Sequence, residues 1–539
     1  MQNLYRWYML VVMLMEIIKK GTKYIQGENL MQQSINTTGR PPYGIIAVLI
    51  IGAFIAFLNN TLLNVALPSI MIDLDIGPST VQWLTTGFML VSGIMIPLSA
   101  YLIQKYSVRR LFLTAMGLFT LGTILAGAAH IFPVLLSGRM IQASGTAILM
   151  PLLMNVMLVS FPIEKRGTAM GIFGLVLMFA PAIGPTLSGW LIEHYDWRML
   201  FHFVTPIAAT VLMLGFFLLK DKKEKVHMRL DFISLTLSSA GFGGLLYGFS
   251  SAGSKGWDSP LVYGTLIIGV VSLIWFILRQ INQDNPMLNF RIYQYPMFAL
   301  SSAISMVITM AMFSGMLLIP LYVQTVRGIS PLDAGLMLLP GAIAMAIMSP
   351  ITGRLFDLFG GRVLAIVGLA ITTVTSYLFS QLTMESTYAY LVILNTVRMF
   401  GMSMVMMPVQ TNGLNQLPAR YYSHGTAMNN TLQQVSGAIG TALLVTVMSN
   451  RAEIHGERLA ANAMREATGQ AAPAALEELK QQIATRAMLE GINDAFFVTV
   501  FVSALALIMA FFIKRARQAE DTIGKKSGEQ KPAKQLMEN

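Results

Sequence analysis

The chain has 539 residues, of which 55% are hydrophobic and only 12% charged, and it contains no cysteine. Its mean hydropathy is +0.61. The charged fraction is about half that of soluble domains, and the apolar residues come in blocks of about twenty, the length that crosses a bilayer. The sequence therefore predicts an all-α polytopic membrane protein. Without cysteine, disulfides and thiolate chemistry are excluded. The six histidines show no ligand spacing, so no metal site is expected.

The first thirty residues differ from the rest. Trp7 to Ile18 is a mostly apolar run too short to span a membrane, and Lys19 and Lys20 follow it. A signal peptide carries its charges before the apolar run. One interpretation is an interfacial helix. The interpretation we favour is that Met31 is the biological start, because Gly27-Glu28 can be encoded by a purine-rich stretch shaped like a bacterial ribosome-binding site.

Fourteen apolar segments follow, each long enough to span a membrane. They lie near 44–67, 82–103, 111–130, 133–159, 168–192, 200–219, 232–252, 260–280, 298–323, 333–352, 363–383, 387–412, 425–449 and 494–514. Links after even-numbered segments hold most of the basic residues: Lys105, Arg109, Arg110, Lys165, Arg166, Lys220, Lys222, Lys223, Lys225, Arg229, Arg279, Arg291, Arg354, Arg362 and Arg420. Because cytoplasmic loops retain such residues, both termini are predicted to be cytoplasmic. The net charge of +11 then requires no nucleic-acid partner.

One link is different in length and composition. Residues 450–493 are polar and show helical periodicity. By the predicted orientation this stretch faces the outside. It is interpreted as a solvated helical hairpin without chemistry of its own.

An internal repeat organises the chain. Gly167-Thr168-Ala169-Met170 recurs 258 residues later, from Gly425, and Arg139 recurs 259 residues later as Arg398. The link from Ala100 recurs from Gly353, 253 residues later. These offsets predict two six-helix halves with two helices inserted between them. The expected units are an N-terminal segment 1–43, a half 44–219, the inserted pair 220–297, a half 298–514 and a tail 515–539. Parallel repeats place a substrate site between the halves, near mid-membrane.

The stretch from Gly167 to Leu191 contains no charged residue and is rich in glycine and proline. Neighbouring membrane helices satisfy the carbonyls that a proline frees, and glycines let helices approach closely. A kinked structural helix and a gating helix are both compatible with this composition. The gating interpretation is favoured, because the repeated stretch from Gly425 has no proline before Ser449.

Residues Gly353 to Arg362 read GRLFDLFGGR and fit the pattern GxLxDxxGxR. This resembles the loop signature of the major facilitator superfamily. Glycines permit a tight turn, and an aspartate can cap a helix and pair with an arginine as a breakable latch. In the first half Gln104 replaces that aspartate and Ser107 the second glycine. The predicted latch residues are Lys105, Arg109, Arg110, Gly353, Asp357, Gly360 and Arg362.

The stretch from Gly167 also resembles the fifth-helix signature of drug:proton antiporters, at Gly174, Ala180, Pro181, Gly184, Pro185 and Gly189. Further matches are residues 58–68, Trp197-Arg198 and 320–340. Over about residues 40–515 the set resembles the fourteen-span multidrug efflux family of that superfamily, closest to bacterial lincomycin-resistance efflux proteins. The resemblance implies a major facilitator fold in the bacterial cytoplasmic membrane, a monomer, no cofactor, and amphipathic small molecules and protons as substrates.

Arg139 and Gln142 resemble the family's fourth-helix motif. An arginine inside a span is expensive and indicates a function. Its charge would shift the pKa of a nearby acid and assist proton coupling; the alternative is that it pins two helices together. The corresponding Arg398 is assigned to the substrate cavity.

The proton carrier is not identified by sequence. Asn59 stands where the family often has an acid, and asparagine does not take up a proton. Asp and Glu lie only at span ends or in links, so Asp333 and Asp357 are the remaining candidates. The absence of a mid-membrane carboxylate argues against a requirement for cationic drugs. Polar residues predicted to line a substrate cavity, or alternatively to join helices, are Asn59, Asn60, Asn64, Asn155, Gln324, Arg398, Gln410, Asn430 and Gln434.

Two functions remain at this stage. The favoured one is proton-coupled efflux of amphipathic drugs or toxic compounds by alternating access, for which the 39 methionines suit a cavity that accepts varied shapes. The alternative is a facilitator or importer of a physiological solute. An enzyme is disfavoured, because the sequence shows no nucleophile–base pair, metal cluster or phosphate-binding loop.

Overall fold

The computed structural model describes residues 43–81, 83–220, 231–283, 286–466 and 473–514. The N-terminal segment with its alternative start at Met31, the basic link 221–230 and the tail 515–539 lie outside the described residues. Every element in the described part of the chain is a helix. The prediction of an all-α protein is confirmed.

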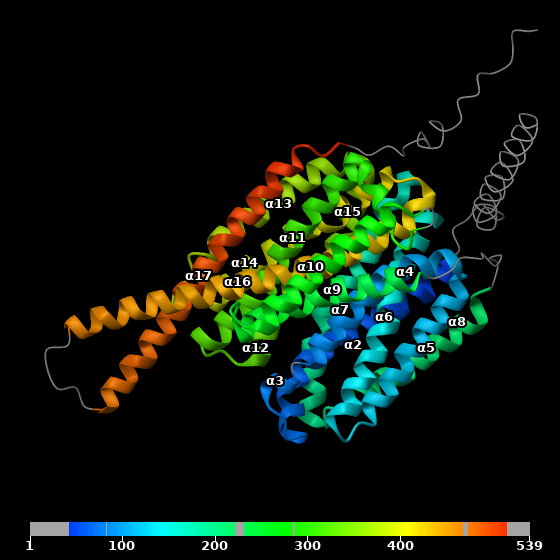
Figure 1. Ribbon diagram of the computed structural model, residues 1–539. Helices are drawn as coiled ribbons and strands as arrows, with labels where there is room; N and C mark the ends of the chain where they lie inside the picture. The colour runs from blue at the N-terminus through cyan, green and yellow to red at the C-terminus, as the bar shows by residue number, and fades with distance from the viewer. Residues whose placement is uncertain (1–42, 82, 221–230, 284–285, 467–472, 515–539) are drawn as a thin grey trace, which may run out of the picture.

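The helices follow the predicted order (Figure 1). The first half contains α2 (Tyr43–Asp73), α3 (Pro78–Val81), α4 (Trp83–Lys105), α5 (Val108–Gly127), α6 (Phe132–Ser160), η1 (Ile163–Lys165), α7 (Arg166–His194) and α8 (Met199–Leu218). The inserted pair is α9 (Phe232–Lys255) and α10 (Pro260–Ile281). The second half contains η2 (Phe290–Gln294), α11 (Pro296–Leu321), η3 (Tyr322–Val326), α12 (Pro331–Phe359), α13 (Gly361–Phe379), α14 (Tyr388–Ser403), α15 (Met406–Gln416), η4 (Ala419–Tyr421), α16 (Tyr422–Glu466) and α17 (Pro473–Ala510).

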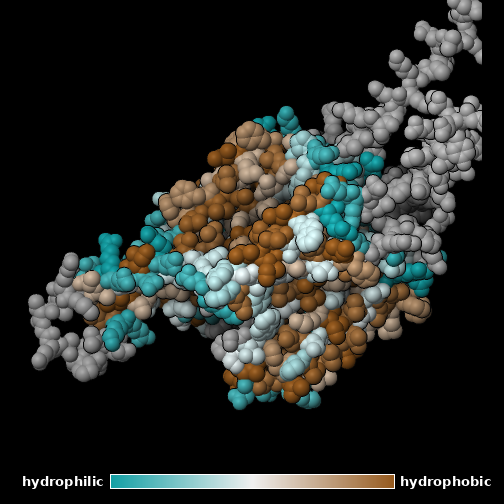
Figure 2. All heavy atoms as spheres, viewed as in Figure 1, coloured by the Kyte–Doolittle hydropathy of each residue, from teal (hydrophilic) through white to brown (hydrophobic). Residues whose placement is uncertain are grey.

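Thirteen helical segments within the described residues are long and apolar enough to cross a membrane. With α7, which is 29 residues long, they make up the fourteen predicted spans. Large apolar side chains remain exposed on the outside of the bundle, among them Phe217 and Trp275. Figure 2 shows the resulting hydrophobic surface over the bundle. This is the surface expected where lipid tails, not water, surround the helices.

The packing confirms two halves with an inserted pair. In the first half α5 packs on α6 and α8, and in the second α13 packs on α14 and α17. The halves meet where α7 lies along α12. The inserted α9 packs against α4 of the first half and α16 of the second. Links after α4, α6, α12 and α15 lie at one end of the bundle, which we call the basic end because Lys105, Lys165 and Arg420 lie there.

The inserted pair is joined by glycines and by one carboxylate. A Cβ on Gly244 would lie 2.8 Å from the Thr265 carbonyl oxygen, so the two helices touch backbone to backbone. Asp231 precedes α9 and accepts a hydrogen bond from Arg279 Nε at 2.8 Å. That bond holds the pKa of the Asp231 carboxyl well below its usual range. The charged pair therefore fixes the two inserted helices at the basic end.

At the opposite end, α16 and α17 extend beyond the bundle as a helical hairpin, at the left of Figure 1. The polar stretch 450–493 provides the ends of these two helices. His455 joins them, because its Nδ1 lies 2.8 Å from Glu490 Oε2 and its Nε2 lies 2.9 Å from Asp494 Oδ2. Arg451 also pairs with Asp494.

The absence of cysteine allows a direct test of orientation. A single cysteine replacing Glu457, which is exposed on the hairpin, is expected to react with a membrane-impermeant maleimide in intact cells. One replacing Glu164, exposed at the basic end, is expected to react only after permeabilisation. The cysteine-free parent is the control for background labelling. The reverse pattern would overturn the predicted cytoplasmic termini.

Candidate functional site

The site begins at the N-terminus of α7, where the first backbone N–H groups have no partner within the helix. Asp357, near the end of α12, accepts them. Its Oδ1 lies 2.8 Å from Gly167 N, and its Oδ2 lies 2.9 Å from Thr168 N and 2.7 Å from Thr168 Oγ1. A carboxylate in this position stabilises a helix end by about 1–2 kcal/mol. Asp357 thus caps a helix of the opposite half.

Next to this cap the two helices touch through glycines. A Cβ on Gly171 would lie 2.6 Å from the Ser349 carbonyl oxygen, and a Cβ on Gly353 would lie 2.3 Å from the Gly167 carbonyl oxygen. A Cβ on Gly174 would be equally close to the Ser349 side chain. Ser349 Oγ donates to the Gly171 carbonyl at 2.8 Å. Any larger side chain here would push α7 and α12 apart. We call these contacts, with the Asp357 cap, the glycine seam.

Two further residues cross between the halves, and they occupy equivalent repeat positions 258 residues apart. Arg166, at the start of α7, donates to Asn415 Oδ1 at 3.2 Å and to the Tyr422 hydroxyl at 2.8 Å. His424, near the start of α16, has Nε2 3.2 Å from Gln104 Nε2. Sequence reasoning used Arg166 only for topology and gave His424 no role. Their place directly before the repeated Gly-Thr pair is the signal that identifies both.

The other predicted latch residues lie around this end. Lys105 donates to the Tyr101 hydroxyl at 2.9 Å, and Arg109 donates to the Phe216 carbonyl at 3.1 Å. Both contacts stay within the first half. Gly360 ends α12 with a φ of 79°, a backbone conformation that favours glycine. Arg110 and Arg362 have exposed side chains.

Arg139 lies inside α6 with 1% of its side chain exposed. Its Nη1 donates to Gln142 Oε1 at 2.9 Å, and its Nη2 donates to Asn60 Oδ1 at 3.0 Å. The guanidinium carbon is 4.4 Å from the centre of the Phe88 ring, and Gln142 Nε2 donates to Thr123 Oγ1 at 2.7 Å. The cation is therefore solvated by two amides and an aromatic face, none of which titrates near neutral pH.

The predicted cavity residues have different environments. Asn59 on α2 and Gln410 on α15 are buried, and Asn59 Nδ2 has no hydrogen-bond partner among the described residues. Asn155 on α6 and Asn430 and Gln434 on α16 are half-buried. Gln324 is exposed on η3, so in this conformation it does not line a buried cavity. The side chain of Asn64 lies outside the described residues.

Beyond the glycine seam, α7 packs within its own half. A Cβ on Gly184 would lie 2.2 Å from Thr61 Oγ1 on α2. Ser188 Oγ donates to the Leu62 carbonyl at 2.6 Å. The N-terminal part of α7 therefore joins the two halves, and its C-terminal part packs against α2 of its own half. The other predicted gating positions on α7 are Ala180, which is buried, Gly189, which is half-buried, and Pro181 and Pro185, whose side chains are outside the described residues.

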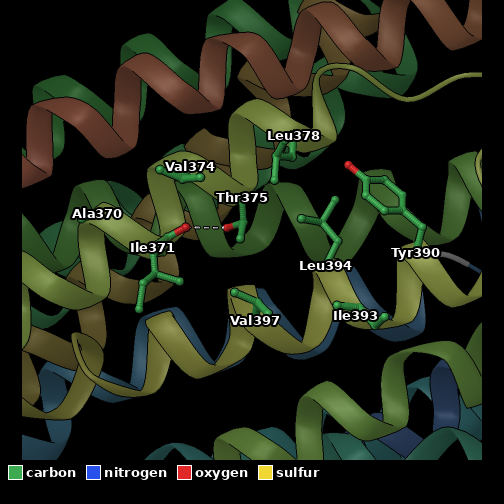
Figure 3. Close-up of a pocket in the computed structure, with 9 residues that line it drawn as sticks. All are labelled: Ala370, Ile371, Val374, Thr375, Leu378, Tyr390, Ile393, Leu394 and Val397. Carbon is green, nitrogen blue, oxygen red and sulfur yellow. Dashed lines mark hydrogen bonds between the residues drawn. The ribbon is translucent and has the colours of Figure 1, made fainter.

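An apolar groove of about 440 Å³ lies between α13 and α14 (Figure 3). Its walls include Val374, Leu378, Ile393 and Val397, all of which are exposed on the outside of the bundle. None of the residues that line it is a predicted site residue. The groove belongs to the lipid-facing surface.

Duplicated halves that meet through a capped, glycine-lined contact, with buried arginines in the spans, define a multi-pass membrane transporter. Comparison with known proteins gives the family. The model of the Major Facilitator Superfamily matches residues 49–441, and the chain belongs to that superfamily. Its relatives are transporters and not enzymes, as the sequence predicted.

Three relatives and one solved structure illustrate the match. The MFS-type transporter YhcA of Bacillus subtilis is 46% identical over 91% of this chain and 96% of its own. The lincomycin resistance protein LmrB of Bacillus subtilis is 44% identical over 88% of this chain and 96% of its own. The multidrug export protein EmrB of Haemophilus influenzae is 26% identical over 86% of this chain and 94% of its own. The crystal structure of the human organic anion transporter MFSD10 matches with a TM-score of 0.59 at 14% identity, over 87% of this chain and 99% of its own. This match shows a similar fold.

The Asp357 cap is tested by its effect on the seam. Ser349→Cys places a thiol between α7 and α12 where reagents reach it only after the seam opens. Adding Asp357→Ala removes three accepted hydrogen bonds, about 1–2 kcal/mol, and is expected to raise the rate of thiol labelling roughly tenfold. Glu164→Ala, a nearby exposed acid, is the control. An unchanged rate in Asp357→Ala would contradict the latch.

The two parts of α7 are distinguished by a second pair of variants in the Ser349→Cys background. Gly171→Val meets the backbone of α12 and is expected to hold the basic end apart, with fast labelling and at least tenfold slower transport. Gly184→Val meets Thr61 within the first half and is expected to leave labelling at the parental rate. Equal labelling in both variants would refute this division of α7.

Proposed function

We propose that the protein exports amphipathic drugs or toxic compounds from bacteria in exchange for protons, by alternating access, as a monomer with both termini in the cytoplasm. The observation that carries the proposal is the glycine seam at the basic end. It joins the halves through close glycine contacts, the Ser349 hydrogen bond and the Asp357 cap, which is an arrangement that opens without disturbing either half's own core.

The energetics of the seam agree with a moving part. A cap of about 1–2 kcal/mol, together with small-residue contacts, is comparable to the few kcal/mol that separate exchanging conformations. When the seam opens, substrate enters between the halves from the cytoplasm or the inner leaflet. When it closes, as in this structure, the substrate is released to the outside. Uptake of protons from outside would then favour the return.

The charge of Asp357 is the proposed means by which the seam is held closed. The carboxylate accepts all three hydrogen bonds from Gly167 and Thr168. A neutral side chain in its place, as in Asp357→Asn, binds the helix N-terminus less tightly. Arg139 is held in place by Gln142 and Asn60. Its permanent charge would act on other charged groups within the first half.

The relatives support drugs as the cargo. LmrB is named for lincomycin resistance and EmrB for multidrug export, and both align with nearly the whole chain. Lincomycin is therefore the first substrate to test.

Inverted membrane vesicles with an acidic interior provide the test. Adding lincomycin is expected to raise the internal pH as protons leave in exchange for drug, and a protonophore is expected to abolish the effect. Asp357→Asn is expected to reduce the exchange rate at least tenfold, with Glu164→Gln as the matched control. Drug movement that ignores the pH gradient would reject antiport and favour a facilitator.

A further inference from the structure

The two buried arginines occupy equivalent positions but have different surroundings. Arg139 in the first half is held by Asn60, Phe88 and Gln142. Asn60 lies on α2, Phe88 on α4 and Gln142 on α6, the helix of Arg139 itself. Together they provide two hydrogen-bond acceptors and one aromatic ring. Arg398 in the second half lies 259 residues later and is equally buried, with 1% exposed.

All three neighbours are replaced by glycine in the second half. Gly315 follows Asn60 by 255 residues, Gly341 follows Phe88 by 253, and Gly401 follows Gln142 by 259, which are the offsets of the repeat. Contacts in the structure support the first two of these correspondences, Gly315 with Asn60 and Gly341 with Phe88. A Cβ on Gly315 would lie 2.0 Å from Arg398 Nη1, and a Cβ on Gly341 would lie 2.7 Å from Asn395 Nδ2. Arg398 therefore has no amide partner equivalent to Asn60 or Gln142, and its side-chain neighbours are the rings of Phe379 and Phe496.

The result is a group of buried polar atoms without partners. Arg398 Nη2 donates to the Ala311 carbonyl at 2.7 Å, but Nε and Nη1 have no partner in the described part of the chain. Asn395, one turn earlier on α14, is fully buried, and neither of its amide atoms is bonded there. Ser376 Oγ is also unbonded, whereas its counterpart Thr123 binds Gln142. A buried polar atom without a partner destabilises the fold.

The carboxylates of the surrounding helices are engaged elsewhere. Asp357 caps α7. Asp494 binds His455 on the hairpin. Asp333 accepts from Ser330 Oγ at 2.8 Å, and lies eight residues before Gly341, about 12 Å along the helix. A guanidinium remains charged at any accessible pH. Unlike Arg139, Arg398 has neither a carboxylate nor an amide acceptor among the described residues.

We propose that Arg398 and Asn395, which lie among the helices of the second half, bind the anionic group of an amphipathic substrate, a carboxylate, sulfonate or phosphate, in the conformation that takes up substrate. Arginine is the residue best suited to such groups. Phe379 and Phe496 stack at 5.1 Å, with ring centres 5.7 and 6.0 Å from the Arg398 guanidinium carbon, and provide an apolar wall for the rest of the molecule. This assignment names the substrate class and rests on the proposed efflux function.

The test uses two probes that differ only in charge: 11-(dansylamino)undecanoic acid and its primary amide. Binding to the purified full-length protein is followed by dansyl fluorescence. The native chain is expected to bind the acid at least tenfold more tightly than the amide. Arg398→Gln is expected to abolish that preference and leave amide binding unchanged, while Arg398→Lys retains it in part. Arg291→Gln, the same change at an exposed arginine, is the control.

A second variant distinguishes loss of the anion site from misfolding. Asn395→Asp supplies an internal counter-charge one turn from Arg398, so it is expected to raise the Tm and to abolish the preference for the acid. Equal binding of acid and amide by the native chain, or an unchanged preference in both Arg398→Gln and Asn395→Asp, overturns the anion site.

The anion site and the efflux function fail separately. If lincomycin still drives proton exchange in vesicles while acid and amide bind equally, the anion site is wrong and efflux stands. If the acid is preferred but no substrate moves protons, the anion site stands and antiport is wrong.

Discussion

The contact between the Asp357 carboxylate and the first N–H groups of α7 joins the two halves. The first N–H groups of a helix have no partner within the helix and need one from elsewhere. Here the partner comes from the opposite half. The rest of the seam consists of glycines packed closely against backbone and against Ser349. Arg166 adds a second charged contact between the halves, to Asn415 and Tyr422.

The duplicated halves keep the same scaffold and differ in chemistry at equivalent positions. The first link places a neutral Gln104 beside His424, where the second link places the Asp357 carboxylate on α7. Both links thus contact the opposite half, one through a neutral amide and the other through a carboxylate. The first arginine has amide neighbours, where the second has glycines and two phenylalanine rings.

Charge is distributed in an unusual way for a membrane protein. The spans carry Arg139 and Arg398 in their interiors, while the carboxylates of the described helices lie at span ends or on the hairpin. A buried cation without a carboxylate is costly, and the cost is tolerated where function needs the charge. The proposed anion site would favour anionic substrates, in line with the expectation drawn from the missing mid-membrane acid.

The sequence alone determined the number of spans, the two halves with an inserted pair, the family resemblance and the role of Asp357 as a helix cap. Those features depend on hydropathy, turn residues and repeat offsets, which are properties of short stretches. Only the tertiary structure decided which helix Asp357 caps, that Arg166 and His424 cross between the halves, and that Asn60, not its neighbour Asn59, binds Arg139. Adjacent residues point about 100° apart around a helix, so a partner is fixed only once each helix has its rotation and depth.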